Sequence, residues 1–312
     1  MNPLRFRNTD NGVDASLAID YAMFFAVALM WSGSFLLIKV AVAEISPLGI
    51  TAARVVIAAV VLYAWLRLTG GTLPREPRDW FAFCFIGLVG NILPFFLIGF
   101  GEQSVDSGLA AILMGIMPLA TIVLAHLLVP EEPFTARLGL GVALGFGGVV
   151  VLVGLDAMAG FGASTLGQLA VIGGALCYSV NTVFVRRTVV LGGPVMAAGS
   201  QLAGAAMIVP VTLLFEGPVR FDAGAAALAS VVLLGLFSTA LATLFYFRLV
   251  RNLGAGRMSQ VNYLIPVLGA LWGILFLGER LEPSTFFALA LVLAGIAVVS
   301  RRRSGTGAGA PS

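Results

Sequence analysis

Long apolar segments follow one another along almost the whole chain of 312 residues. Hydrophobic residues make up 59% of the sequence and charged residues only 11%, whereas charged residues make up about 25% of an ordinary soluble domain. A helix that spans a bilayer needs roughly 20 apolar residues. The sequence therefore excludes an ordinary soluble protein and predicts an all-α integral membrane protein.

Charged breaks and breaks rich in proline or glycine divide the chain into ten apolar segments of about this length. We expect spans at residues 21–43, 47–68, 79–99, 107–129, 135–155, 166–186, 194–215, 225–248, 257–278 and 284–300. Residues 1–20 are polar and are expected to form an N-terminal tail. Residues 301–312, three arginines followed by small residues and proline, predict a basic and then disordered tail.

The basic residues indicate an orientation. If the N-terminus is cytoplasmic, most of the 18 Lys and Arg residues lie on the cytoplasmic side, and only Arg220 and Arg280 lie on the other. Lys39 and Arg54 fall inside spans. This bias follows the positive-inside rule and predicts that both termini are cytoplasmic. The net charge of +3 therefore reflects orientation and does not indicate a nucleic-acid partner.

The second half of the chain repeats the first. Pro118, Glu131 and Gly147 return 148 positions later as Pro266, Glu279 and Gly295. Trp31 aligns with Tyr178 at nearly the same shift. Each repeat then holds five spans, in residues 21–155 and 166–300, and an odd number of spans inverts the second repeat in the membrane. Inverted repeats are typical of alternating-access carriers.

These residues carry a resemblance to a known family. Its motifs are Trp31-Ser32, Arg54, Gly108 to Met117-Pro118, Gly256 to Ile265-Pro266, Glu131 and Glu279. From Tyr21 to Ser300 the chain is similar to the ten-helix EamA type of the drug/metabolite transporter superfamily. The resemblance implies an inner-membrane exporter or facilitator of small metabolites, often amino acids. The chain departs from symmetry at Gln201, which matches Arg54, so a symmetric role for that arginine is not expected.

In inverted-repeat carriers the substrate binds near the midplane, between the repeats. The substrate-binding candidates there are Trp31, Ser34, Asn91, Met114, Tyr178, Asn181, Thr239, Asn262 and Tyr263. Trp31 and Ser34 share one helix face, as do Tyr178 and Asn181. Together they predict an aromatic cavity with amide and hydroxyl groups, suited to a zwitterionic metabolite. Alternatively, the polar side chains bond to backbone and across helices, as is common in membrane proteins.

Prolines and cations inside the spans are further candidates. Pro118 and Pro266 each remove a helical hydrogen bond, and matched kinks indicate a hinge at the site, or simple packing bends. Lys39 is expected to extend to the outer end of its span. Arg54 lies about two turns deep, where a charge needs a partner or a function. We expect it to meet Glu44, an unpaired carbonyl or a substrate carboxylate.

The centres of the expected spans contain no Asp or Glu. A proton-coupled multidrug or cation exporter needs a desolvated, titratable carboxylate, so it is an alternative that the sequence disfavours, and uncoupled facilitated diffusion fits as well. The remaining candidates for proton coupling are His126 and, at the short outer turn, Glu102 and Asp106. The alternatives are a structural role for His126 and a solvated loop for the two carboxylates.

A different class would be an intramembrane enzyme or a non-transporting scaffold. One histidine without central carboxylates assembles no familiar catalytic or metal site, so we predict no enzyme, no metal and no cofactor. A scaffold would not need matched kinks at the midplane. The expected partners are a small-molecule substrate and the lipid bilayer, and the sequence is compatible with a monomer.

Overall fold

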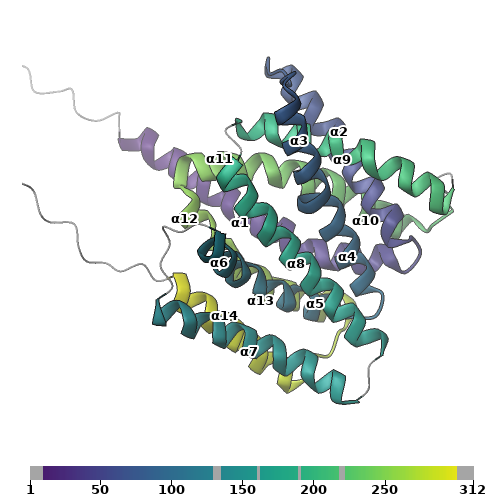
Figure 1. Ribbon diagram of the computed structural model, residues 1–312, viewed down its shortest axis with the longest axis vertical. Helices are drawn as coiled ribbons and strands as arrows, with labels where there is room; N and C mark the ends of the chain where they lie inside the picture. Colours follow the sequence, from purple (N-terminus) through teal and green to yellow (C-terminus); the bar gives the residue numbers. More distant parts are fainter. Residues whose placement is uncertain (1–9, 129–134, 160–161, 189–190, 218–221, 301–312) are drawn as a thin grey trace, which may run out of the picture.

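The computed structural model describes residues 10–128, 135–159, 162–188, 191–217 and 222–300, and all regular structure within these ranges is helical (Figure 1). Eight helical segments are long and apolar enough to cross a membrane, and two shorter apolar helices, Val261–Leu277 and Pro283–Val299, follow. The all-helical membrane class is confirmed. The count of ten spans and the cytoplasmic placement of both termini stay predictions.

The two halves of the chain contain the same order of elements except for the 3₁₀ turn η2, which is present in the first half alone among the described residues. The first half comprises α1 (Asp10–Val42), α2 (Pro47–Leu68), α3 (Pro77–Phe85), η1 (Ile86–Ile92), α4 (Leu93–Glu102), α5 (Ser107–Leu113), η2 (Met114–Ile116), α6 (Met117–Leu128) and α7 (Ala136–Ala159). The second comprises α8 (Ala163–Thr188), α9 (Gly193–Glu216), α10 (Ala225–Leu233), η3 (Leu234–Leu241), α11 (Ala242–Leu253), α12 (Ala255–Met258), α13 (Val261–Leu277) and α14 (Pro283–Ser300).

The two halves pack through equivalent helices. α2 lies against α9, and α7 lies against α14, the latter pair side by side along one edge of the molecule (Figure 1). A Cβ atom on Gly295 would come within 2.6 Å of the Gly141 carbonyl oxygen, so small residues let the backbones of α7 and α14 approach closely. The main apolar core surrounds α5, η2 and α6, where Ile112, Leu113 and Leu119 are fully buried.

Two expected boundaries are wrong. α1 begins at Asp10, so the second half of the expected tail 1–20 is helical. The ninth span is broken, because α12 ends at Met258 and α13 begins at Val261. Residues 1–9, Glu131 and the 301–312 tail lie outside the described residues.

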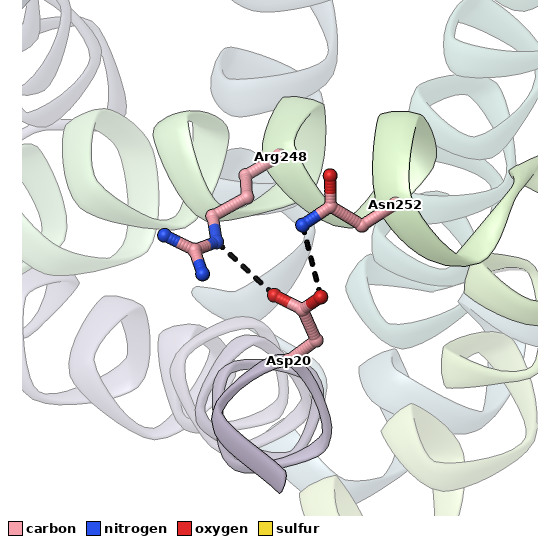
Figure 2. Close-up of polar contacts among 3 residues, drawn as sticks. All are labelled: Asp20, Arg248 and Asn252. Carbon is pink, nitrogen blue, oxygen red and sulfur yellow. Dashed lines mark hydrogen bonds and ion pairs between the residues drawn. The ribbon is translucent and has the colours of Figure 1, made fainter. Parts of the chain in front are cut away.

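Asp20 explains why the first helix extends into the polar segment. This carboxylate is 3% exposed, and Figure 2 shows it between two side chains of α11. Arg248 Nε donates to its Oδ1 at 3.1 Å, and Asn252 Nδ2 donates to its Oδ2 at 2.9 Å. A residue that the sequence placed in a solvated tail therefore connects the two repeats.

Replacing Asp20 with alanine is expected to lower the free energy of unfolding by about 1 kcal/mol, because hydrogen bonds between membrane helices contribute modestly and the Arg248 side chain, 40% exposed, can turn to water. Thermal unfolding in detergent, followed by tryptophan fluorescence, measures the change. Asp222→Ala, at an exposed position, is the control, and equal midpoints for the two variants would contradict the structural role of Asp20.

Candidate functional site

Two wide helical turns lie at equivalent positions of the repeats. η1 and η3 are π-helical segments inserted between α3 and α4 and between α10 and α11. They begin at Ile86 and Leu234, which are 148 positions apart, like the matched prolines. Short π segments are rare and occur frequently at functional sites. Each repeat thus contains one π-helical turn at the equivalent position.

In each π-helical turn, a polar side chain donates a hydrogen bond to a backbone carbonyl oxygen of the same turn. Asn91 Nδ2 donates to the carbonyl oxygen of Ile86 at 3.3 Å, and Thr239 Oγ1 donates to that of Leu234 at 2.9 Å. Both bonds reach back five residues from equivalent positions. These two candidates therefore satisfy backbone acceptors within the widened turns.

The opposite repeat contacts each of these side chains. Arg54 Nε of α2 donates to Thr239 Oγ1 at 2.6 Å, and Gln201 Nε2 of α9 donates to Asn91 Oδ1 at 3.1 Å. Because Gln201 occupies the position that matches Arg54, the two bonds are equivalent. The hydrogen bond of Arg54 therefore has a counterpart in the other repeat, contrary to our expectation. Its positive charge has no counterpart, because Gln201 is neutral.

Arg54 is a buried cation with a neutral partner. It is 6% exposed, and its guanidinium carbon lies 3.8 Å from the centre of the Phe95 ring, a cation–π contact. No carboxylate among the described residues forms an ion pair with it. The expectation that Arg54 pairs with Glu44 is wrong, because Glu44 Oε2 instead accepts a hydrogen bond from the Gly224 N–H at 2.6 Å. The guanidinium is chemically able to hold a carboxylate through its remaining N–H groups.

Two residues of α8 complete this region. Tyr178 packs against the apolar cluster that contains Phe95 and Val55. Asn181 lies against η1, where a Cβ on Gly90 would be 2.7 Å from its Cγ atom, and its buried Oδ1 has no hydrogen bond within the described residues. We call the following set the central polar cluster: Arg54, Asn91, Tyr178, Asn181, Gln201 and Thr239.

The structure separates the other aromatic candidates from this cluster. The Trp31 ring lies 5.8 Å from that of Tyr246 on α11, in a different apolar cluster from Tyr178. The shared aromatic cavity of Trp31 and Tyr178 stays a prediction. Ser34 Oγ donates to the Trp31 carbonyl oxygen at 2.6 Å, and the Tyr263 hydroxyl donates to that of Ile296 at 2.9 Å.

The remaining midplane candidates lie on the broken helices. Met114 packs against the main core from η2, the 3₁₀ turn that comes just before Pro118. Asn262 is half-buried at the start of α13, and Pro266 lies buried inside that helix. Each proline thus lies in a helix with a break less than two turns before it, and the hinge role stays a prediction.

Charged groups gather at one end of the molecule, where α1, α4 and α13 end. Lys39 Nζ donates to the carbonyl oxygens of Glu102 and Val105, both at 2.8 Å. The Glu102 side chain is 0% exposed, so the solvated-loop alternative is wrong for this residue. Asp106 is exposed, and partial burial together with the charge of Glu279 raises the pKa of Asp106 above its usual value. His126 lies in the last turn of α6, towards the other end.

Glu279 closes this end by capping a helix of the other repeat. Gly278 directly follows the last residue of α13, and its φ of 66° turns the chain back. Glu279 then accepts from the Ser107 N–H at 2.8 Å, from the Ser107 hydroxyl at 2.7 Å and from the Gly108 N–H at 2.9 Å. A carboxylate is favoured at this N-terminus of α5 because the first N–H groups of a helix lack helical acceptors.

Two cavities open at the same end. One, of ≈ 330 Å³, is lined by Lys39, Val42, Ala43, Glu102 and Gln103. The other, of ≈ 240 Å³, is lined by polar and charged residues that include Ser104, Asp106, Ser164, Gln168 and Arg280. Neither cavity includes the central polar cluster.

Known proteins resemble the chain over nearly its whole length. Residues 19–154 and 165–301 match the EamA-like transporter family. YedA of Escherichia coli (strain K12), an uncharacterized inner membrane transporter, is 24% identical over 90% of each chain. A "Probable terminal-alkyne amino-acid exporter" of Streptantibioticus cattleyicolor is 27% identical over 88% of this chain and 91% of its own.

A solved crystal structure aligns with a TM-score of 0.63, 25% identity, and coverage of 90% of this chain and 96% of that chain. Two matched ranges that together cover most of the sequence, one in each repeat, establish the family. The protein is a member of the EamA-like transporter family.

Proposed function

We propose that the protein is a secondary transporter that exports or equilibrates small metabolites, foremost amino acids, by alternating access between its inverted repeats. The observation that carries the proposal is Arg54, a buried cation at the interface of the repeats whose hydrogen-bond partner is a neutral hydroxyl of the opposite repeat. Family membership and the named amino-acid exporter support the substrate class. The inner membrane transporter YedA supports an inner-membrane location.

The central polar cluster fits both ends of an amino acid. The N–H groups of Arg54 suit a carboxylate, because guanidinium and carboxylate form paired, charge-assisted hydrogen bonds. The buried Oδ1 of Asn181 lacks a donor within the described residues and suits an ammonium group. Because α2, α8 and η3 come from different repeats, a substrate bound here would contact both, and rocking of the repeats would carry it across the membrane.

Counterflow into proteoliposomes tests the substrate class. Vesicles loaded with unlabelled L-leucine, L-phenylalanine or L-serine are expected to take up the same labelled amino acid saturably. The corresponding amino-acid amides, which lack the carboxylate, are expected to compete at least about tenfold more weakly, because they cannot form the charged bond with Arg54. Absence of counterflow, or equal competition by the amides, would refute the proposal.

The alternative, a proton-coupled multidrug or cation exporter, is favoured by one observation, the fully buried carboxylate of Glu102. Such an exporter would bind its cation at that carboxylate. The same vesicles discriminate the two functions, because extrusion of a lipophilic cationic dye driven by a pH gradient, without amino-acid counterflow, would establish the alternative.

A further inference from the structure

Glu102 is a carboxylate in the interior of the protein. It is the last residue of α4, its side chain is 0% exposed, and within the described residues neither carboxylate oxygen has a hydrogen bond. Lys39 lies beside it but donates to the backbone oxygens of Glu102 and Val105. Burying an ionised carboxylate without hydrogen-bond partners is unfavourable, and such groups take up a proton instead.

The surrounding charges do not remove this cost. The charged groups that face Glu102 are Lys39 from α1, Arg54 from α2 and Glu279 from the segment before α14. Both cations donate to other acceptors, and Glu279 adds a negative charge. The other elements packed against α4, namely α5, α8 and η1, contribute no acidic residue, and the arginines of α8 lie in its last turn.

A cavity that is open to the surface lies beside Glu102. The cavity of ≈ 330 Å³ is lined by Glu102 and Lys39 together with Ala43 and Gln103, and the last two residues are exposed. A polar cavity of this size has room for several water molecules. Both carboxylate oxygens of Glu102 are buried in this structure, so a proton passes between one of them and water in the cavity only when the side chain turns towards it. The protonated side chain is a neutral carboxylic acid.

We infer that Glu102 is a proton-binding site and that its protonation is linked to substrate binding at Arg54. The link is electrostatic, and it rests on the proposed function of Arg54. The Arg54 guanidinium lies against Phe95 of α4, two turns before Glu102 on the same helix. At this separation its positive charge favours an ionised Glu102, and a substrate carboxylate that binds Arg54 cancels this charge. Proton and substrate therefore favour each other, and by reciprocity protonation of Glu102 strengthens substrate binding.

Substrate affinity as a function of pH tests this linkage. For the purified wild type in nanodiscs, the affinity for the amino acid that gives the strongest counterflow is expected to fall on the order of tenfold as Glu102 loses its proton with rising pH. Glu102→Gln, which mimics the protonated acid, is expected to bind tightly at every pH. Glu282→Gln, an exposed carboxylate at the same end, is the matched control and should keep the wild-type profile.

Infrared difference spectra give a readout that needs no substrate. Across the same pH titration, exposed acids and a buried carboxylic acid without hydrogen bonds absorb at different C=O frequencies. The C=O band of such a buried acid is expected in the wild type and in Glu282→Gln, and is expected to be lost in Glu102→Gln. A wild-type affinity that does not change with pH overturns the linkage even if the variant fails to fold, and a C=O band that persists in Glu102→Gln overturns the assignment. If the wild type binds and transports none of the amino acids while the band is present, the proposed function fails and the proton site stands.

Discussion

Arg54→Gln is expected to fold normally and to lose at least about tenfold in affinity for amino acids, because a charge-assisted bond to a substrate carboxylate contributes about 1.5–3 kcal/mol. Folding should survive because the equivalent position already holds a glutamine that donates across the repeats, from Gln201 to Asn91. A glutamine at position 54 can bond to Thr239 in the same way. The substitution thus removes the charge and retains the neutral hydrogen bond.

The measurement is counterflow at a series of substrate concentrations, with amino acids and their amides in parallel. We expect KM for amino acids to rise in Arg54→Gln, and the preference over amides to disappear. Arg54→Lys keeps the charge without the planar, five-donor group. Its KM for amino acids should lie between that of Arg54→Gln and that of the wild type. If the glutamine variant still prefers amino acids over amides as strongly as the wild type does, Arg54 does not bind the substrate carboxylate.

The sequence predicted the membrane class and the family because both depend on long patterns. Ten apolar segments and a repeat with a constant register survive errors of several residues at each boundary. The same register paired Asn91 with Thr239 and Arg54 with Gln201, and in the structure these four residues form two equivalent contacts. Inferring that a neutral residue breaks the symmetry was the error, because glutamine donates a hydrogen bond as arginine does.

What the sequence could not predict depends on contacts between distant residues. The π-helical turns have no local pattern in a single sequence, and only the structure shows that Ile86 and Leu234 begin them. Glu102 precedes Gln103 and Ser104, which are exposed, so a solvated loop was a natural alternative. Lys39, which is 63 positions away, lies beside that turn and donates to its backbone.

The aromatic candidates show the limit of symmetry. Trp31 and Tyr178 occupy matching positions in the two halves of the chain, but matching positions do not determine which residues are in contact. Each packs against the other repeat, Trp31 beside Tyr246 and Tyr178 beside Phe95. The sequence repeat therefore identifies equivalent positions in the two halves, but it does not identify which residues are in contact.

Gly87→Ala is expected to lower the free energy of unfolding by about 2–3 kcal/mol, because it forces a methyl group into a backbone contact that cannot give way. Gly87 lies in η1 against α9, and a Cβ there would be 2.8 Å from the Ser200 carbonyl oxygen and 2.9 Å from the Gly204 nitrogen. The helices would have to separate next to Gln201, which also weakens its bond to Asn91. Thermal unfolding in detergent and counterflow are both expected to report the loss.

Gly147→Ala is the matched control for this substitution. Gly147 lies within α7, and a Cβ there meets no atom within 4 Å, so alanine should be neutral or stabilise the helix by up to about 1 kcal/mol. The comparison separates the effect of a methyl group at the repeat interface from the general effect of replacing glycine in a membrane helix. Equal unfolding midpoints for the two variants would mean that η1 and α9 are less closely packed than the structure indicates. A large loss confined to Gly87→Ala would support the tight contact of η1 with α9 that holds one half of the central polar cluster together.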